Sequence, residues 1–420
     1  MVIIRQLPAP LRVFFDSLKP HFQRRAWQHV WALVLAIAIA TGRRNVNTLY
    51  QQIQADVYRQ KYNDFLTVSP WQGPVVLQTA ARQVLALLAP QPGELLEAIL
   101  DASGTRKRGQ TMEAAHYYWD PQLKQKVWGH RFVLLILRIQ GVVLPWAVAL
   151  YLPKAFCRSP KGRALGLQCK TLSQLAADLL QTLPEDLRAF FRIRVLFDAG
   201  FFNQTVVGAC QALGWRYVSV AKANRAFWPD HYQGKRHVGR YGPGVLRYEG
   251  QEIRLPNAKG RLQRFRVAER TGRMRKVGHV KVVFSRRLSD GSFLVLVTDD
   301  FTLSAREVVA AYQARWAVEV TLKQLKQHLG LGHYQTTIYE GVVHHLHLVC
   351  LAHLLLTSLG LQDPGIQEAL RKHTMLKLAS LGTRQAHLQA LIWHDNLQTL
   401  RRLPYSRLFI NKLAGVIRFP

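Results

Sequence analysis

Apolar and polar positions alternate at helical spacing through the first 90 residues of the chain. Leu18 to Ala40 is a long amphipathic stretch, Thr41-Gly42 interrupts it, and residues 43–49 begin a second helical pattern. Gln91-Pro92-Gly93 then marks a boundary, because proline and glycine together end regular structure. Residues 1–92 are therefore predicted to form a separate helical region.

Short apolar runs separated by turns follow this boundary. They predict a strand over Leu95–Leu100, two strands over Val127–Ile139 and Val142–Leu152 joined by a tight Gln140-Gly141 turn, and further strands over Ile193–Phe197 and Trp215–Ala221. Helical patterns over Leu172–Leu183 and Thr205–Leu213 lie between the later strands. Alternating strands and helices of this kind predict a mixed α/β layer arrangement over residues 93–221.

The stretch from about Lys222 to Val297 differs in character, being rich in glycine, arginine and aromatic residues. Alternating runs such as Gln263–Val267 and Val277–Phe284 predict antiparallel strands. Residues 216–298 hold nineteen Lys or Arg and five Asp or Glu. We therefore interpret residues 222–298 as an inserted β subdomain with one strongly basic face.

A helical pattern resumes at Ser304, which forms a predicted capping box with Glu307, and runs to about Leu329 before Gly330. Residues 299–340 are assigned to the second part of the α/β domain, and residues 341–420 to a helical C-terminal region. Val342–Leu359 is strongly apolar but is interrupted by four histidines, which favours a buried helix over a membrane span. The histidines around it match no zinc motif, and packing explains them better.

Charge points to a polyanionic partner. The 420 residues include 57 Lys and Arg against 25 Asp and Glu, a formal net charge of +32. This excess makes nucleic acid the leading candidate. Hydrophobic residues form 49% of the chain, which excludes a disordered basic tail. The four cysteines form no C-x-x-C pair and no signal-peptide pattern is present, so an intracellular, cytoplasmic setting is expected.

The N-terminal helical pair can be interpreted in two ways in view of this charge. A helix, a glycine turn and a second helix with arginines at its start are compatible with a helix-turn-helix that reads DNA through Arg43 and Arg44. The same pattern is typical of two helices that simply pack together. Both interpretations stay open at this point.

Two aspartates stand out in a chain this poor in acids. Asp101 and Asp198 each follow an apolar strand pattern and precede a glycine-containing segment. Ligands of open α/β sheets gather at such strand ends. The simpler interpretation is that each aspartate starts a turn or caps a helix.

A third carboxylate lies on the helix before Gly330. Counted at about 100° per residue, one face of this helix carries a phenol, a guanidinium, a carboxylate and two ammonium groups; these are Tyr312, Arg315, Glu319, Lys323 and Lys326. A solvated helix face could show the same pattern. Three carboxylates would nevertheless suit Mg²⁺, which prefers oxygen ligands, and two such ions can support phosphodiester chemistry.

These residues resemble the Tyr-Arg-Glu-Lys signature of DDE transposases of bacterial insertion sequences, in the insertion-sequence-four-like family. The signature is Y-x2-R-x3-E-x6-K, and every spacing is met by Tyr312, Arg315, Glu319 and Lys326. Asp101 to Gly109 resembles the family's first-aspartate motif, Val127 to Val133 its following strand, and Leu196 to Phe201 its second-aspartate motif. The resemblance covers roughly residues 95–355.

The resemblance implies an RNase H-like catalytic domain, interrupted by a β insertion before the glutamate helix and flanked by helical N- and C-terminal regions. The 120 positions between Asp198 and Glu319 leave room for that insertion. Asp101, Asp198 and Glu319 would be the catalytic residues and would bind two Mg²⁺ ions, for which Mn²⁺ could substitute. Cleavage through hairpin DNA ends and joining of the 3′ ends to target DNA would follow.

The resemblance also implies DNA contacts. Tyr312, Arg315 and Lys326 would contact phosphates at the element's ends, and Lys323 lies on the same helix face. A tryptophan of the insertion stacks on a flipped base in such enzymes, and Trp228, near Arg225, is the candidate, although insertion core would explain it equally. Arg106 and Lys107 follow Asp101 closely enough to touch phosphate.

The sequence thus predicts a Mg²⁺-dependent transposase that acts on double-stranded DNA, at the element's terminal inverted repeats and at the target, as a homodimer and without a membrane partner. One alternative is an RNase H-like nuclease that cuts without strand transfer. Another is a domesticated, catalytically inactive DNA-binding protein. The complete set of carboxylates argues against the second alternative.

Overall fold

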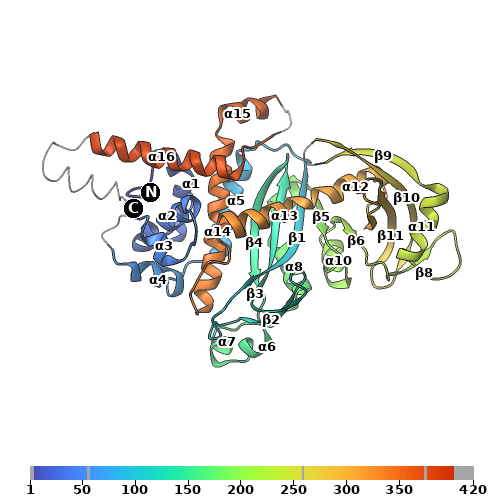
Figure 1. Cartoon of the computed structure of the whole chain (residues 1–420), viewed down its shortest axis with the longest axis horizontal. Helices are drawn as coiled ribbons and strands as arrows, with labels where there is room; N and C mark the ends of the chain where they lie inside the picture. The colour runs from blue at the N-terminus through green and yellow to red at the C-terminus, as the bar shows by residue number, and fades with distance from the viewer. Residues whose placement is uncertain (1–3, 54–56, 258–259, 373–375, 402–420) are drawn as a thin grey trace.

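A computed structural model describes residues 4–53, 57–257, 260–372 and 376–401 of the chain (Figure 1). The N-terminal region is helical, as its spacing predicts, and its elements are η1 (Ala9–Leu11), α1 (Arg12–Asp16), η2 (Lys19–His21), α2 (Arg24–Ile39), α3 (Val46–Tyr50), α4 (Arg59–Thr67) and α5 (Gly73–Ala86). The long α2 starts six residues later than predicted, because Lys19-Pro20-His21 forms a 3₁₀ turn.

One large mixed sheet runs through the rest of the molecule. Its strand order is β2-β3-β1-β5-β6-β12-β11-β10-β7-β8, with β4 beside β3 and β9 beside β10. The strands of the first half are β1 (Leu95–Arg106), β2 (His116–Asp120), β3 (Gln125–Ile139), β4 (Val142–Leu150), β5 (Arg192–Phe197) and β6 (Arg216–Val220). β1 pairs antiparallel with β3 and parallel with β5, and β5 pairs parallel with β6. The chain is therefore a mixed α/β protein.

The hairpin between β3 and β4 forms at the predicted turn. Gln140 and Gly141 have φ angles of 50° and 81°, and two successive positive φ values are the geometry of the tight turn that matches strand twist. The register from Ile139↔Val142 to Phe132↔Leu150 follows from this turn.

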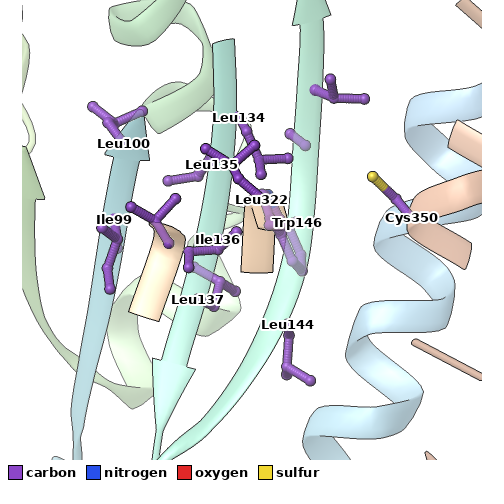
Figure 2. Close-up of a cluster of buried hydrophobic side chains, with 14 of the residues drawn as sticks. Ile99, Leu100, Leu134, Leu135, Ile136, Leu137, Leu144, Trp146, Leu322 and Cys350 are labelled. Atoms are coloured by element: carbon purple, nitrogen blue, oxygen red, sulfur yellow. The ribbon is translucent and has the colours of Figure 1, made fainter. Parts of the chain in front are cut away.

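Helices cover the sheet and bury its apolar side chains. α8 (Leu172–Gln181) begins with a capping box at Thr171 and contacts β3, while α5 and α14 (Tyr339–Leu361) contact β4. Figure 2 shows Leu322, from a later helix, and Trp146 of β4 among the leucines and isoleucines of β1 and β3, with Cys350 of α14 nearby. The remaining helices near this core are α6 (Lys154–Cys157), α7 (Pro160–Ala164), α9 (Glu185–Phe190) and α10 (Gln204–Ala212).

The apolar helix α14 lies inside the protein. It is long and apolar enough to cross a membrane by length and composition, yet 94% of its most apolar window is buried in the structure. This agrees with the predicted buried helix. Two further C-terminal helices follow, α15 (Pro364–Arg371) and α16 (Leu381–Arg401); the predicted helical region beyond residue 401 lies outside the described residues.

The basic segment extends the same sheet. β12 (Phe293–Thr298) pairs antiparallel with β6, and the other elements there are β7 (Ala226–Pro229), β8 (Arg236–His237), α11 (Val238–Glu249), β9 (Gln251–Pro256), β10 (Leu262–Met274) and β11 (Gly278–Arg287). The helix α11 was not predicted, because it contains Gly-Pro-Gly. It forms since Gly242 lets the helix pack closely on Phe284 and Phe293, where a Cβ atom would lie 2.3 Å from Phe284 Cδ1.

The helix before Gly330 consists of three consecutive pieces. Ser304 and Glu307 form the predicted capping box at its start. α12 (Ala305–Ala314) and α13 (Trp316–Lys323) follow, and the π-helical turn η3 (Gln324–His328) ends it; Gly330 has a φ of 70°. The π turn was not expected, and it shifts Lys326 relative to a regular helix. Such turns often lie at functional sites.

Candidate active site

Asp101 and Asp198 lie on neighbouring parallel strands at equivalent positions. β1 and β5 pair from Leu95↔Arg192 to Ile99↔Leu196, and Asp101 and Asp198 each come two residues after the last pair. Alternation puts two residues further along a strand on the same face. The two carboxylates therefore leave the same face of the sheet, side by side, where the two strands part.

The two aspartates differ in their local backbone. Asp198 follows the last residue of β5, and its Oδ1 accepts hydrogen bonds from the backbone N–H groups of Gly200 (2.9 Å) and Phe201 (3.2 Å). Asp101, by contrast, lies within β1. The predicted Leu95–Leu100 strand ends too early, because residues 101–106 continue to pair with β3. β1 therefore stays paired with β3 beyond the point where its pairing with β5 ends.

Glu319 of α13 is linked to Asp101 by Arg315. The Arg315 guanidinium forms an ion pair with Glu319 one turn later, and its Nη1 lies 3.9 Å from Asp101 Oδ2. Its side chain is 13% exposed. The helix and β1 are also in direct contact. The guanidinium thus bridges the first aspartate and the glutamate.

The electrostatics show that the carboxylates are crowded. The pKa of Asp101 is raised to about 6, chiefly by burial, then by the charge of Asp198, and less by Glu319, while Arg315 opposes the shift. A second buried carboxylate on β1, Glu97, has a different setting, since it is ion-paired with Arg138 directly opposite on β3. Unlike Glu97, Asp101 has no paired base on a neighbouring strand, and its nearest base is Arg315 on the helix.

The carboxylate oxygens of Asp101, Asp198 and Glu319 suit a divalent cation, although the three side chains do not converge on a single point. Within the described ranges, no three Asp, Glu, His or Cys side chains are close enough to form a metal site as they stand. The cause is visible: Glu319 is held by Arg315, whose positive charge lies between the carboxylates. A hard cation such as Mg²⁺ binds carboxylate oxygens. Its charge would offset the repulsion between Asp101 and Asp198 and lower the raised pKa of Asp101.

The other signature residues surround this group. Tyr312 is half-buried, and its ring centre lies 5.5 Å from the Arg315 guanidinium. Burial lowers the pKa of Lys326, and Asp120 and Asp101 both attract its charge. Lys323 is exposed on the same helix. Tyr312, Arg315, Glu319 and Lys326 thus lie on the helix that faces Asp101.

Lys107 has a structural role instead of the predicted phosphate contact. Its Nζ donates to the carbonyls of Gly332 and Tyr334, both at 2.8 Å, and lies 3.1 Å from the centre of the Tyr334 ring. Burial lowers its pKa to about 7. Arg106, one residue earlier, is exposed. Strand alternation sends the two side chains to opposite sides, which charge alone could not distinguish.

Arg44 is likewise not available to DNA. It is 4% exposed and donates to the carbonyls of Ile37 (3.0 Å), Ala40 and Gly42 (2.9 Å) at the end of α2. Burial lowers its pKa to about 10. Arg43 stays exposed, while the following helix α3 spans only five residues. This geometry favours the packing interpretation for Arg44.

Arg225 contacts the segment that follows the second aspartate. Its guanidinium is 5.2 Å from the ring centre of Phe202, four residues after Asp198, and donates to the Arg275 carbonyl. Trp228, three residues on, is 36% exposed and pairs with Arg273 across β7 and β10. An extended strand covers about 10 Å in three residues, so Trp228 lies about that far along the chain from Arg225.

A buried polar network that sequence reasoning missed joins β1 and β3 to the loop after the glutamate helix. The Tyr334 hydroxyl bonds Thr105 Oγ1 (2.9 Å) and His130 Nδ1 (2.8 Å), and His130 Nε2 bonds the Glu113 carbonyl (2.8 Å). Because Nε2 must donate to a carbonyl, Nδ1 accepts from the tyrosine. The network fixes Gly332–Tyr334 over the end of β1. The sequence around Tyr334 contains no motif that predicts this hydrogen-bonding role.

Three histidines of α14 are buried and bonded, in keeping with the predicted packing role. His345 bonds the Gly330 carbonyl, His347 the Val343 carbonyl and His353 the Gln324 side chain. Two of these bonds join α14 to the end of the glutamate helix.

Part of the chain matches a family model. Residues 170–355 match the family model described as the transposase DDE domain, a range that includes Asp198 and Glu319 but begins after Asp101. No curated protein matches the chain in sequence. Among solved structures, the chain is similar to a piggyBac transposase synaptic complex with hairpin DNA, at 9% identity and a TM-score of 0.46, over 97% of this chain and 82% of that one. The matched range therefore marks this region as similar to a DDE transposase domain.

Proposed function

We propose that the protein is a DDE transposase that binds the terminal inverted repeats of a DNA element, cleaves its ends and joins them to target DNA. The proposal rests on two observations. Asp101 and Asp198 leave one face of the sheet, and Arg315 links Asp101 to Glu319. Asp198 and Glu319 also lie inside the range that matches the transposase DDE domain. A fold with this triad and a +32 charge suits cleavage of a polyanion.

The topology supports an RNase H-like assignment for the catalytic domain. Strands β4, β3 and β1 are antiparallel neighbours, and β5 and β6 follow β1 in parallel on its other side. We propose the domain limits 93–221 and 299–340 for this unit, interrupted by residues 222–298. The helical regions 1–92 and 341–420 would flank it.

Asp101, Asp198 and Glu319 would hold two Mg²⁺ ions, or Mn²⁺ in their place. When bound, such ions activate the attacking oxygen and stabilise the leaving oxygen of a phosphodiester. The chain's own contribution is to hold three carboxylates at one strand junction and to keep one cationic side chain, Arg315, beside them. Release of Glu319 from Arg315 would complete the ligand set.

Arg315 is suited to take a DNA phosphate. Its Nε is buried and has no hydrogen-bond partner among the described residues. A buried unpaired donor is costly, and a planar guanidinium matches the oxygens of a phosphate. Tyr312 and Lys326 lie close enough to contact the same strand end. The proposed phosphate contact would thus satisfy Arg315 and free Glu319 in one step.

The basic insertion supports a second phosphate-binding surface. On β9, β10 and β11, like charges face each other directly, as Arg264↔Arg254 and Arg266↔Arg286. Such pairs destabilise a sheet, and Glu252 offsets only part of this repulsion through Arg254 and Arg264. A DNA backbone would neutralise the remainder.

The reaction sequence follows from the proposed chemistry. Water attacks the phosphodiester at the element's end and leaves a free 3′-hydroxyl. That hydroxyl attacks the opposite strand, displaces the flanking 3′-oxygen and closes a hairpin, which water reopens; the 3′ ends then attack target DNA. We propose that two copies of the chain hold the two ends, on chromosomal DNA in the cytoplasm.

The test uses a plasmid that carries the element with its own flanking repeats. Purified protein with Mg²⁺ is expected to release the element and to join it to a second plasmid, and chelation of the metal should stop both reactions. Release without joined product would favour the nuclease alternative. Binding without any cleavage would favour the inactive DNA-binding protein.

A further inference from the structure

An exposed aromatic surface lies at the hairpin end of the sheet, beyond the candidate active site. Tyr117 and Trp119 of the edge strand β2 are 66% and 57% exposed. The Tyr117 ring lies 5.2 Å from the ring of Trp128 on β3, and Trp119 pairs with Lys126. We call these four side chains (Tyr117, Trp119, Lys126 and Trp128) the hairpin ledge.

Pairing and alternation place the ledge on the same face of the sheet as Asp101. Asp101 pairs with Leu134 and Thr105 with His130; Trp128 comes two residues before His130 and pairs with Tyr117. Paired residues share a face, and so do residues two apart. Tyr117 therefore projects from the same face of the sheet as Asp101.

The opposite face confirms this assignment independently. Tyr118 is buried, and its hydroxyl lies over Gly104, where a Cβ would come within 2.4 Å. The Arg131 guanidinium lies 5.7 Å from the Tyr118 ring on that side. Because Tyr118 fills the face behind the sheet, Tyr117 and Trp119 must project from the front.

The ledge is held in place and is not a loose surface patch. The indole Nε1 of Trp128 donates to the Gly109 carbonyl at 2.8 Å, and the Lys107 backbone N–H donates to the Trp128 carbonyl at 2.9 Å. Asp120 Oδ1 accepts from the N–H groups of Gln122 and Leu123 and orders the turn after β2. The aromatic rings are thus presented before any ligand arrives.

The separation from the carboxylates suits a strand of DNA. Trp128 lies six residues along β3 from Leu134, the partner of Asp101, which is about 20 Å at strand spacing. Lys326 lies within electrostatic reach of both Asp101 and Asp120, the last residue of β2. A DNA strand that extends from the carboxylates to the ledge would therefore pass Lys326 and need only a few nucleotides to cover this distance.

The charge of the surroundings indicates the kind of ligand. Exposed basic side chains flank the ledge, namely Arg108 and Lys124. The acidic Glu113 nearby is already paired with Lys161. Exposed aromatic rings among exposed cations bind unpaired nucleotides, because rings stack on bases and cations hold the backbone. An apolar protein partner would not be complementary to this charge.

We propose that the hairpin ledge binds the unpaired bases of a DNA strand whose phosphate lies at Asp101 and Asp198. The inference rests on the proposed DNA substrate, and it adds a binding site for single-stranded DNA on the catalytic side of the sheet. Tyr117 and Trp119 would stack on bases, and Lys126 would contact the backbone.

The test compares two DNA probes without divalent metal, by fluorescence anisotropy on the full chain. One is a blunt duplex of about 20 base pairs, and the other is the same duplex with a tail of about six thymidines. Tyr117→Ala combined with Trp119→Ala is expected to weaken binding of the tailed probe by at least tenfold, roughly one stacked base or more, and to leave the blunt probe within about twofold. Trp119→Phe should keep most of the affinity.

Trp393→Ala is the matched control, because Trp393 is 40% exposed on α16, away from the sheet edge. Equal binding of the tailed probe by the double variant and the wild type would overturn the proposal while leaving the proposed function standing. A change of oligomeric state in the double variant, measured by sedimentation, with no change in tail binding would make the ledge a contact between copies and also overturn it. Failure of the wild type to bind either probe would overturn both proposals.

Discussion

Asp101 and Asp198 occupy equivalent positions on two parallel strands, each two residues beyond the last pair of β1 and β5. The strands part there, so two carboxylates face the same space with Arg315 as their nearest base. The like charges of the two carboxylates repel each other, and several measurable consequences follow.

Asp101→Asn is expected to stabilise the protein while it removes DNA cleavage. The folded-state pKa of Asp101 is raised to about 6, so ionisation costs stability as the pH rises from about 4 through 6, and an amide avoids that cost. At pH 7.5 the free energy of unfolding should increase by about 1–3 kcal/mol, with little difference near pH 4. Denaturant titration at the two pH values checks this.

Glu97→Gln is the matched control for Asp101→Asn, because it changes a buried carboxylate of the same strand. Glu97 is paired with Arg138, so its loss leaves a half-buried guanidinium unpaired and should cost roughly 2–4 kcal/mol at pH 7.5. Equal destabilisation by both substitutions would contradict the crowded-carboxylate description of Asp101.

Arg315→Gln is expected to tighten metal binding without DNA and to slow cleavage. The guanidinium neutralises Asp101 and holds Glu319; without it, Mn²⁺ should bind about tenfold more tightly, while the phosphate contact is lost. Isothermal titration with Mn²⁺ measures the first effect. Arg306→Gln, on the exposed side of α12, should change neither, and unchanged Mn²⁺ affinity in Arg315→Gln would refute the bridging role.

The neighbours Arg106 and Lys107 should respond to substitution in opposite ways. Lys107→Met leaves the Gly332 and Tyr334 carbonyls without their donor and should lower the free energy of unfolding by about 1–3 kcal/mol. Arg106→Met should leave stability within about 0.5 kcal/mol and reduce the slope of log K against log salt by about 1. Chemical denaturation and binding at several salt concentrations separate the two roles.

Acid should destabilise the C-terminal core through its buried histidines. Burial lowers the pKa of His345 and His347 to about 4, and that of His353 to about 3. Below about pH 6.5 the unfolded chain takes up protons that the folded chain does not, so stability falls as the pH drops from 6.5 toward 4. Melting temperatures across this range should decline steeply.

His347→Leu should make that decline shallower, because His347 bonds only a carbonyl of its own helix and its loss removes one proton uptake. His394→Leu, at an exposed site on α16, is the control and should leave the pH profile unchanged. Identical profiles for all three proteins would show that His347 does not contribute to acid unfolding.

Patterns that depend on neighbouring residues in the chain could be predicted from the sequence. The Gln140-Gly141 turn and the Ser304 capping box formed as predicted, since each is decided within a few residues. The helix face with Tyr312, Arg315 and Glu319 followed from periodicity alone. Grouping that face with the two aspartates required the family's motif spacing.

Features decided by distant contacts could not be predicted. Asp101 lies within a strand because β3 continues beside it, and α11 forms despite its Gly-Pro-Gly because Phe284 and Phe293 receive Gly242. Lys107 is buried on the carbonyls of Gly332 and Tyr334, which only the fold brings to it. The sequence shows that a residue is basic, but it does not show which group that residue binds in the folded protein.

The most direct measurement compares the wild type with Asp198→Ala on one duplex that carries an end of the element. With Mg²⁺, the wild type should cleave the end and form joined product, while Asp198→Ala should bind the same duplex with similar affinity and cut nothing. Unchanged cleavage by Asp198→Ala would contradict the assignment of the Asp101, Asp198 and Glu319 site as the catalytic centre.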